Sequence, residues 1–377
     1  MSLVIDEHRQ YLTDEHRLQA FAAAIARVVR PGDVVVDLAS GTGILGLLAC
    51  RAGAARVYAI EHTAIIELAR GIARENGCAD RIVHVQGLSG DVTLPERADV
   101  VIADQIGRFG FDAGIIEFFE DARRRFLKPG GRLVPCRLEL HAAMVHAAAQ
   151  YERIRAWDRR HAGFSFTSVR ASAAQTGYPA TLGPDELLVV CDGCAGVDLS
   201  QPMQQRIRWN TQAIAPNGAT IQGLAGWFVA HLAPGVTMTN DPRSRERIDR
   251  RAVFLPVIEP FAVRTGDEVG IEIFVRPRQM FLSWSVQVSG RVQRQTTFGG
   301  MLIARSDVQR MRPDAVPQLT ARGRARLATL QLCEAGRTVQ QIESELASRY
   351  PDLFAGAEDA AAFAAEALSR SASVSAP

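Results

Sequence analysis

The run Val34–Gly46 reads VVVDLASGTGILG. Its three leading valines favour a buried strand, because β-branched side chains pack well within a sheet. Asp37 lies at the carboxyl end of this strand, and Ser40–Gly43 turns the chain into the apolar, helix-like run Ile44–Cys50. Glycines allow positive φ angles and close approach of a ligand, and a helix N-terminus offers free N–H groups. The stretch therefore predicts a strand, a glycine loop and a helix that together bind an adenine nucleotide or nucleoside.

Two kinds of cofactor compete for this loop. Gly41–Gly46 matches G-x-G-x-x-G, the pattern of nicotinamide and flavin dinucleotide sites. Asp37 favours S-adenosylmethionine, because a carboxylate here would repel a pyrophosphate and attract a cationic amino group. Glu61 follows the next predicted strand, Val57–Ile60, where an acid can bind the ribose hydroxyls of either cofactor. The two acids together favour the sulfonium nucleoside.

Strands and helices alternate up to about residue 140. After the first strand, the predicted strands are Val57–Ile60, Ile82–Val85, Asp99–Asp104 and one from Arg132, and the predicted helices include 13–29, Ile65–Glu75 and Ile115–Phe126. This order predicts a doubly wound parallel sheet that binds ligands at the carboxyl ends of its strands. Asp37, Glu61 and Asp104 all lie at such ends, so we expect three acids on one rim.

The rest of the chain divides into a β-rich and a helical part. Short runs such as Gln222–Leu232 and Phe281–Val288, separated by turn residues, predict an antiparallel domain, most simply a barrel or sandwich. From about Met301 three short helices are expected, with Thr338 as an N-cap. The predicted boundaries are 1–140 for the sheet domain, 141–300 for the β domain, 301–370 for the helical module and 371–377 for a disordered tail.

Composition excludes several functional classes. The chain has 377 residues and a net charge of +2, which implies no attraction to nucleic acid. No run has the length of a membrane span or the pattern of a signal peptide, so a cytoplasmic protein is expected. Six cysteines are scattered through the chain, as suits reduced thiols. The pair Cys191 and Cys194 has no second pair or nearby histidine, and therefore predicts no metal site.

With these residues in view, the chain resembles the protein arginine methyltransferase family from about His8 to Val288. The matching segments are His8-x-x-Tyr11-Leu12-x-Asp14-x-x-Arg17, the loop Asp37–Leu45, Ile60-Glu61, Leu127–Gly131, Gly223–Phe228 and Arg264–Asp267. The resemblance implies a Rossmann-like methyltransferase domain of class I followed by an antiparallel β-barrel. It also implies a homodimer formed through an arm near residues 150–175.

The resemblance implies S-adenosylmethionine as the cofactor. Arg17 would bind its carboxylate, Asp37 and Gly41–Gly43 its amino-acid part, Glu61 its ribose, and Leu88 and Ser89 its adenine. The cofactor-binding residues carried over from the family are His8, Arg17, Asp37, Ala39, Gly41, Gly43, Ile44, Glu61, Leu88 and Ser89.

The acceptor side departs from the family pattern. The two glutamates of its double-glutamate loop fall on Asp104 and Ala113, with Asp112 beside the second position. Asp104 and Asp112 are the candidate catalytic acids, which would orient the acceptor or take its proton. A guanidinium is best held by paired carboxylates, and Arg108 on the same loop would repel it. A peptide or protein side chain or a small metabolite is therefore expected as the acceptor, with arginine disfavoured.

Other departures leave alternatives open. The T-H-W loop of the family falls on Arg247-Ile248-Asp249, and the tyrosine-rich helix before the histidine is absent. A protein that binds S-adenosylmethionine without catalysis is thus a second hypothesis, and a nicotinamide-dependent enzyme is a third. In the helical module, Gly336–Ile342 and Tyr350-Pro351 resemble winged-helix domains that hold precursor peptides.

Overall fold

The computed structural model describes residues 4–190, 195–215, 217–369 and 371–372. The pair Cys191 and Cys194 lies outside these residues, as does most of the tail predicted at 371–377. The chain divides into two compact units, Met1–Met301 and Leu302–Pro377. Across the described residues, no helix is long and apolar enough to cross a membrane, and no group of three or more His, Cys, Asp and Glu side chains could hold a metal ion.

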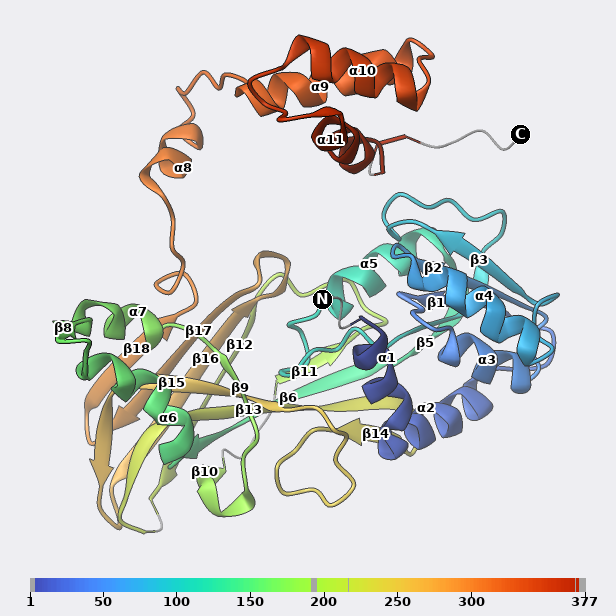
Figure 1. Ribbon diagram of the computed structural model, residues 1–377. Helices are drawn as coiled ribbons and strands as arrows, with labels where there is room; N and C mark the ends of the chain where they lie inside the picture. Colours follow the sequence, from blue (N-terminus) through green and yellow to red (C-terminus); the bar gives the residue numbers. More distant parts are fainter. Residues whose placement is uncertain (1–3, 191–194, 216, 370, 373–377) are drawn as a thin grey trace. The chain divides into compact units, whose positions relative to one another are not determined.

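Unit 1 contains the predicted parallel sheet, whose five strands run in the order β3-β2-β1-β4-β5. The strands are β1 (Val34–Leu38), β2 (Arg56–Glu61), β3 (Ile82–Gln86), β4 (Ala98–Ala103) and β5 (Leu127–Val134). The connecting helices are α3 (Ile44–Arg51), α4 (Ile65–Glu75) and α5 (Ile115–Arg125). Because such crossovers are right-handed, α3 and α4 cover one face and α5 the other (Figure 1). The doubly wound sheet is thereby confirmed.

The helix predicted over 13–29 is present, and a further helix precedes it. The structure has two helices, α1 (Val4–Thr13) and α2 (Glu15–Val28). They part at Asp14, whose Oδ1 accepts the Arg17 N–H at 3.2 Å and caps α2. The sequence did not reveal α1 because its apolar side chains form no buried stripe: Ile5 and Leu12 are exposed.

Two antiparallel sheets form the predicted β domain of unit 1. One has the order β10-β6-β13-β15-β9, with β11 on β6 and β14 on β13, and the other has the order β12-β16-β17-β18. Their strands are β6 (Arg137–Val145), β9 (Tyr178–Ala180), β10 (Leu187–Val190), β11 (Ala195–Asp198), β12 (Ile207–Ile214), β13 (Ala219–Ala233), β14 (Val236–Thr239), β15 (Ala252–Val263), β16 (Glu268–Arg276), β17 (Phe281–Val288) and β18 (Arg291–Thr296). The short helices η3 (Pro184–Glu186) and η4 (Pro277–Gln279) lie in connections. The buried Trp284 of β17 links the sheets by donating to the Pro256 carbonyl at 2.9 Å.

An arm projects from this domain, at the end of unit 1 away from the parallel sheet (Figure 1). Its elements are α6 (Ala148–Arg155), η1 (Ala156–Asp158), β7 (Arg160–His161), β8 (Phe164–Ser165), η2 (Thr167–Val169) and α7 (Arg170–Ala173). Arg170 fixes its base by donating to the Ile258 carbonyl at 2.7 Å and pairing with Glu259.

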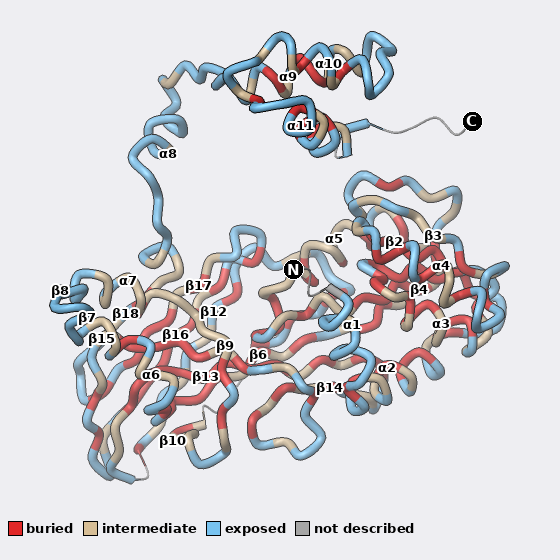
Figure 2. The backbone as a smooth tube through the Cα atoms, in the orientation of Figure 1, coloured by how far each residue is buried: buried red, intermediate tan, exposed pale blue. Residues whose placement is uncertain are grey.

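The parallel and antiparallel sheets of unit 1 share one hydrophobic core, which follows the strands as the buried segments in Figure 2. The loop between β4 and α5 lies at their junction. Its Phe109 is buried and contacts Trp209 of β12 edge-on, with ring centroids 6.1 Å apart. The Asn240 amide also donates to the Arg108 carbonyl at 2.8 Å. The β domain therefore fixes the loop in which the acceptor acids were expected.

Unit 2 is helical over its described residues. Its helices are α8 (Arg305–Arg310), α9 (Ala321–Glu334), α10 (Val339–Arg349) and α11 (Ala357–Ser369). Ala328, Ile342, Leu346 and Phe363 are buried in a small core of its own. Thr338 forms the predicted N-cap, because its hydroxyl accepts the Gln341 N–H while the Gln341 side chain accepts the Thr338 N–H.

Candidate functional site

Asp37 is a fully buried carboxylate at the end of β1. Its Oδ2 accepts the Gly46 N–H at 2.9 Å, while its Oδ1 has no hydrogen-bond partner among the described residues. Burial raises the pKa of this carboxyl to about 7, so near neutral pH it is divided between acid and carboxylate. A cationic ligand would both pair with Oδ1 and stabilise the charged form.

The glycine loop after β1 is shaped for close approach. Ala39, Gly41 and Gly43 have φ angles of 53°, 54° and 82°, and Gly43 is the N-cap of α3. Such left-handed angles favour glycine. Ser40 is buried, and its hydroxyl likewise lacks a partner within the described part of the chain. Two buried oxygens without a partner, one from Asp37 and one from Ser40, thus occur at the loop where α3 begins with free N–H groups.

Glu61 closes the other side of this loop from the end of β2. One carboxylate oxygen accepts the Gly41 N–H at 3.1 Å, and the other accepts the Thr63 N–H at 2.8 Å. Residues Leu38 of β1 and Ile60 of β2 are register partners, as are Leu38 and Ala103 of β4. Parallel register thus brings Asp37, Glu61 and Asp104 to one edge of the sheet, where they were expected.

Helix α1 covers the glycine loop. A Cβ added at Gly41 would lie 2.6 Å from Cε1 of His8, so the imidazole rests directly on this glycine. One turn later, the Tyr11 ring covers Arg17, whose guanidinium carbon lies 4.7 Å from the ring centroid. The sequence offered no signal for this contact between Tyr11 and Arg17. Helix α1 thus contacts both the glycine loop, through His8, and Arg17 of α2, through Tyr11.

Asp104 lies between two guanidinium groups. Buried Arg17 donates from Nε to Asp104 and from a terminal nitrogen to the Tyr11 carbonyl at 2.9 Å. From the β domain, Arg250 approaches both carboxylate oxygens of Asp104 at 3.5 Å. Arg250 also donates to the Gly107 carbonyl at 3.3 Å. The sequence predicted Arg17 and Asp104 as separate binding and catalytic residues, and the structure pairs them.

Asp112 serves the loop that contains it. Its Oδ1 accepts the N–H groups of Arg108 and Phe109 at 2.8 and 2.7 Å. A side chain at Gly107 would collide with this carboxylate, and Gly107 also has a positive φ of 80°. The loop residue Ala113 has no acidic group. Within this loop, Asp104 therefore carries the acid at the rim, and Asp112 holds the turn.

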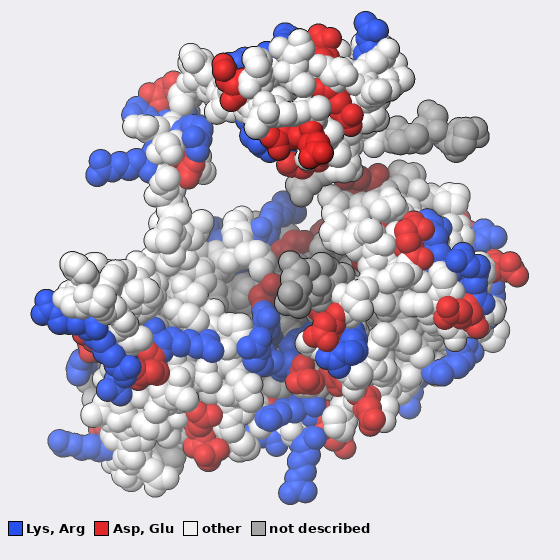
Figure 3. All heavy atoms as spheres, viewed as in Figure 1, with Lys and Arg blue, Asp and Glu red and all other residues white. Residues whose placement is uncertain are grey.

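The remaining predicted residues lie around the edge of the site. Ile44 is the first residue of α3 and is half-buried. Leu88 follows β3 with 57% of its surface exposed, and the Ser89 carbonyl accepts from Arg125. In the loop Arg247–Asp249, which corresponds to the T-H-W loop of the family, the Asp249 N–H donates to Asp14 Oδ2 at 2.8 Å. Basic and acidic side chains are interspersed over the visible face of unit 1 (Figure 3).

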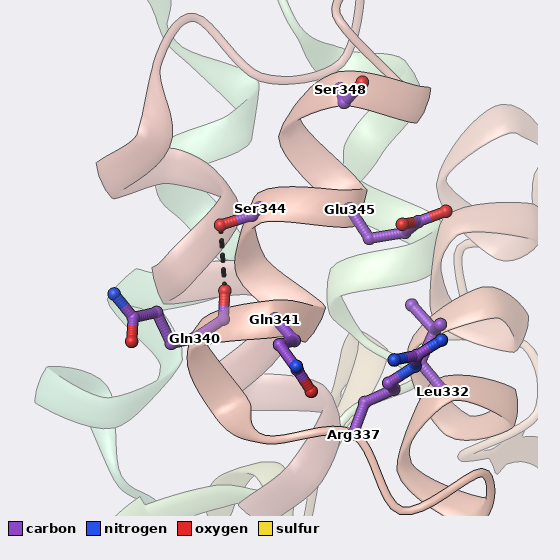
Figure 4. A pocket seen from close by; sticks show the side chains of 7 residues that line it. All are labelled: Leu332, Arg337, Gln340, Gln341, Ser344, Glu345 and Ser348. Carbon is purple, nitrogen blue, oxygen red and sulfur yellow. Dashed lines mark hydrogen bonds between the residues drawn. The ribbon is translucent and has the colours of Figure 1, made fainter.

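A separate cavity of about 440 Å³ lies along α10 in unit 2 (Figure 4). Apart from Leu332, it is lined by polar or charged side chains, namely Arg337, Gln340, Gln341, Ser344, Glu345 and Ser348. None of them belongs to the site in unit 1. The resemblance of this module to peptide-holding domains remains a hypothesis.

The chain is similar to known methyltransferases. The family described as Ribosomal protein L11 methyltransferase (PrmA) matches residues 17–153. Protein arginine N-methyltransferase 1 of Chlamydomonas reinhardtii is 27% identical over 256 residues, which are 66% of this chain and 74% of that protein. Protein arginine N-methyltransferase PRMT10 of Oryza sativa subsp. japonica is 36% identical over 141 residues, which are 37% of each chain.

Solved structures show the same fold. The Trypanosoma brucei PRMT1 enzyme-prozyme heterotetrameric complex with AdoHcy contains a chain that aligns with a TM-score of 0.68 at 22% identity. The alignment covers 77% of this chain and 97% of that chain. The likeness therefore includes both the parallel sheet and most of the antiparallel domain.

Proposed function

We propose that this chain is a class I methyltransferase that uses S-adenosylmethionine and resembles the protein arginine methyltransferases. Its acceptor is a peptide or protein side chain or a small molecule, and an arginine guanidinium is disfavoured. S-adenosylmethionine supplies a methyl group on a positively charged sulfonium. Transfer then requires alignment of the acceptor and removal of water. The observation that carries the proposal is the pairing of Asp104 with two arginines of the chain itself.

The side chains around the glycine loop suit this cofactor. Asp37 Oδ1 and Ser40 Oγ are buried and lack partners within the described chain, as suits oxygens that accept from a ligand. In the proposal Asp37 accepts from the amino group, Glu61 binds the ribose hydroxyls, and Arg17 binds the carboxylate. The other binding residues proposed are His8, Ala39, Gly41, Gly43, Ile44, Leu88 and Ser89.

The residues of α1 and the loop after β4 would prepare the acceptor. His8 and Tyr11 shield the cofactor loop and Arg17, so water is excluded from that side. Asp104 would orient the acceptor or take its proton, and it is the catalytic residue proposed. Asp112 would act through the backbone of Arg108 and Phe109, and is a positioning residue.

A guanidinium acceptor is disfavoured by what these acids already bind. Arginine methylation would call for carboxylates free to hold the guanidinium in two places. Here Asp104 is shared between Arg17 and Arg250, Asp112 is bonded to its loop, and Ala113 has no acid. The relatives are named as arginine methyltransferases, and the acceptor proposed here departs from them for this reason.

Calorimetry of S-adenosylmethionine binding tests the first half of the proposal. Micromolar binding is expected for the wild-type chain, and Glu61→Ala should weaken it at least about tenfold, because a buried hydrogen-bonding acid is lost. Glu67→Ala is the matched control, since Glu67 is an exposed acid on α4. Release of S-adenosylhomocysteine is then measured with peptides and small molecules bearing amine, amide, carboxylate or guanidinium groups. Absence of binding, or turnover confined to guanidinium acceptors, would refute the proposal.

We also propose that the chain forms a homodimer through its arm. Phe164 and Phe166 there are 69% and 40% exposed, although large aromatic side chains favour burial. Arg170 anchors the arm to β15 through Ile258 and Glu259. A fixed base lets the aromatic tip bind a second copy with little loss of conformational entropy.

A further inference from the structure

The guanidinium of Arg250 lies against Asp104 in the way that the guanidinium of a bound substrate could. Two nitrogens of its guanidinium face the two oxygens of the carboxylate, each at 3.5 Å. One of these nitrogens also donates to the Gly107 carbonyl at 3.3 Å. The side chains of Arg250 and Asp104 are only 14% and 6% exposed. The contact is therefore largely withdrawn from water. A charge pair in such a buried place is screened less than one at the surface.

This arrangement uses the groups that a guanidinium acceptor would need. A carboxylate binds a guanidinium best through two short, parallel N–H···O bonds. Arg250 places two nitrogens opposite the two oxygens of Asp104 at the longer distance of 3.5 Å, so it occupies the same positions more loosely. Arg17 occupies the same carboxylate from the other side. The trio of Arg17, Asp104 and Arg250 carries a net charge of +1. A second cation brought beside it would meet like charge in a poorly hydrated site.

We propose that Arg250 is the specificity-determining residue that excludes cationic acceptors, because its own guanidinium occupies Asp104. The inference rests on the proposed function, since it concerns the acceptor half of the same site. Arg250 reaches Asp104 from the β domain, 146 residues along the chain. In this proposal, specificity depends on a contact between the two sheet systems of unit 1.

Removal of the Arg250 charge should open the site to a guanidinium. The probe is ethylguanidinium, titrated by calorimetry into the wild-type chain and the Arg250→Gln variant, each saturated with S-adenosylhomocysteine. We expect Arg250→Gln to bind the probe at least about tenfold more tightly than the wild type. It should also gain at least about tenfold in S-adenosylhomocysteine release, measured as kcat/KM on an arginine-containing peptide.

Matched variants separate charge from general disturbance. Arg250→Lys keeps the positive charge without the planar pair of N–H groups, so it should bind ethylguanidinium more tightly than the wild type and less tightly than Arg250→Gln. Arg251→Gln removes an exposed neighbouring charge and should behave as the wild type. Arg250→Met repeats the test with an uncharged, unbranched side chain should the glutamine variant unfold. Equal probe affinity in the wild type and in the folded neutral variant overturns the inference, as does an affinity of Arg250→Lys below that of the wild type.

The two proposals fail in different ways. S-adenosylmethionine affinity is measured for every variant before the probe is added. If the wild type fails to bind that cofactor, the proposed function falls. If all variants bind it and ethylguanidinium affinity does not change between the wild type and Arg250→Gln, only the inference about Arg250 falls.

Discussion

Asp37 shows how one buried residue can carry both a cost and a function. A carboxyl withdrawn from water resists ionisation, and burial raises the pKa of Asp37 from 3.8 to about 7. At a pH between 3.8 and about 7, the folded chain therefore binds more protons at Asp37 than the unfolded chain does. The free energy of unfolding therefore falls as pH rises through this window, and it levels off above about pH 7. A role in ligand binding would explain why a destabilising acid lies here, since one of its oxygens has no partner among the described residues.

Asp37→Asn is expected to remove this pH dependence. A shift of roughly three pKa units corresponds to at most about 4 kcal/mol, which the wild type should lose between about pH 4 and pH 7 and the variant should keep. Urea unfolding near pH 5 and near pH 8 measures the difference. Asp80→Asn, at an exposed acid, is the control and should follow the wild type. An unchanged slope in Asp37→Asn would contradict the account of the buried carboxyl.

For single residues, the sequence predicted which acids lie at the rim of the sheet better than it predicted the side chains that they contact. Asp37 and Glu61 could be found because an acid after a β-branched run marks the rim of a parallel sheet. The pairing of Arg17 with Asp104 spans 87 residues, and that of Arg250 with Asp104 spans 146. No local pattern reports such contacts, since they depend on how the two sheet systems of unit 1 pack.

Helices with a capping signature were predicted well, and a helix without one was missed. Thr338 is followed three residues later by Gln341, and the structure contains the reciprocal bonds expected of this pair. The end of α4 at Glu75 was also predicted, since Asn76-Gly77 follows it. In contrast, α1 carries no apolar stripe. It contacts the glycine loop through His8 and Arg17 through Tyr11, and neither residue marks a buried helix face in the sequence.

The cap of α10 gives a prediction for unit 2. Thr338→Ala removes the hydroxyl that accepts the Gln341 N–H, so unit 2 should lose roughly 0.5–2 kcal/mol of unfolding free energy. Calorimetric scanning of the full chain measures this as a lower melting temperature for the unit 2 transition. Ser344→Ala on the same helix removes a hydroxyl bonded to the Gln340 carbonyl and should change little. Equal effects of the two variants would contradict the role of the cap.

At the scale of the molecule, the arm provides the test of assembly. Replacing both Phe164 and Phe166 by serine should convert the dimer to monomer at micromolar concentration, because the exposed aromatic surface is lost. Light scattering after size-exclusion chromatography reports the mass. Ile214→Ser changes an exposed apolar residue of β12 outside the arm and should leave the mass unchanged. A wild-type chain that is monomeric, or a dimer that survives the double substitution, would refute assembly through the arm.

The parallel sheet could be predicted as a whole, whereas the pairing of the antiparallel strands could not. Alternating strands and helices joined by right-handed crossovers predict a doubly wound parallel sheet, although they do not fix the observed order β3-β2-β1-β4-β5. The runs that became β13 and β17 were recognised as strands. Their neighbours were not, since β13 pairs with β6, about 80 residues before it, through bonds that any backbone can make.

The contact between Asp14 and Asp249 bears on which parts of the chain tolerate change. Asp14 accepts two N–H groups, one from Arg17 and one from Asp249, so it joins the start of α2 to a loop 235 residues away. The donor in that loop belongs to the backbone, and every amino acid except proline can supply it. A library randomised at position 249 should therefore retain folded members of nearly every kind and lose those with proline. At position 14, selection for folding should favour aspartate, because its two oxygens cap α2 and accept the Asp249 N–H at the same time.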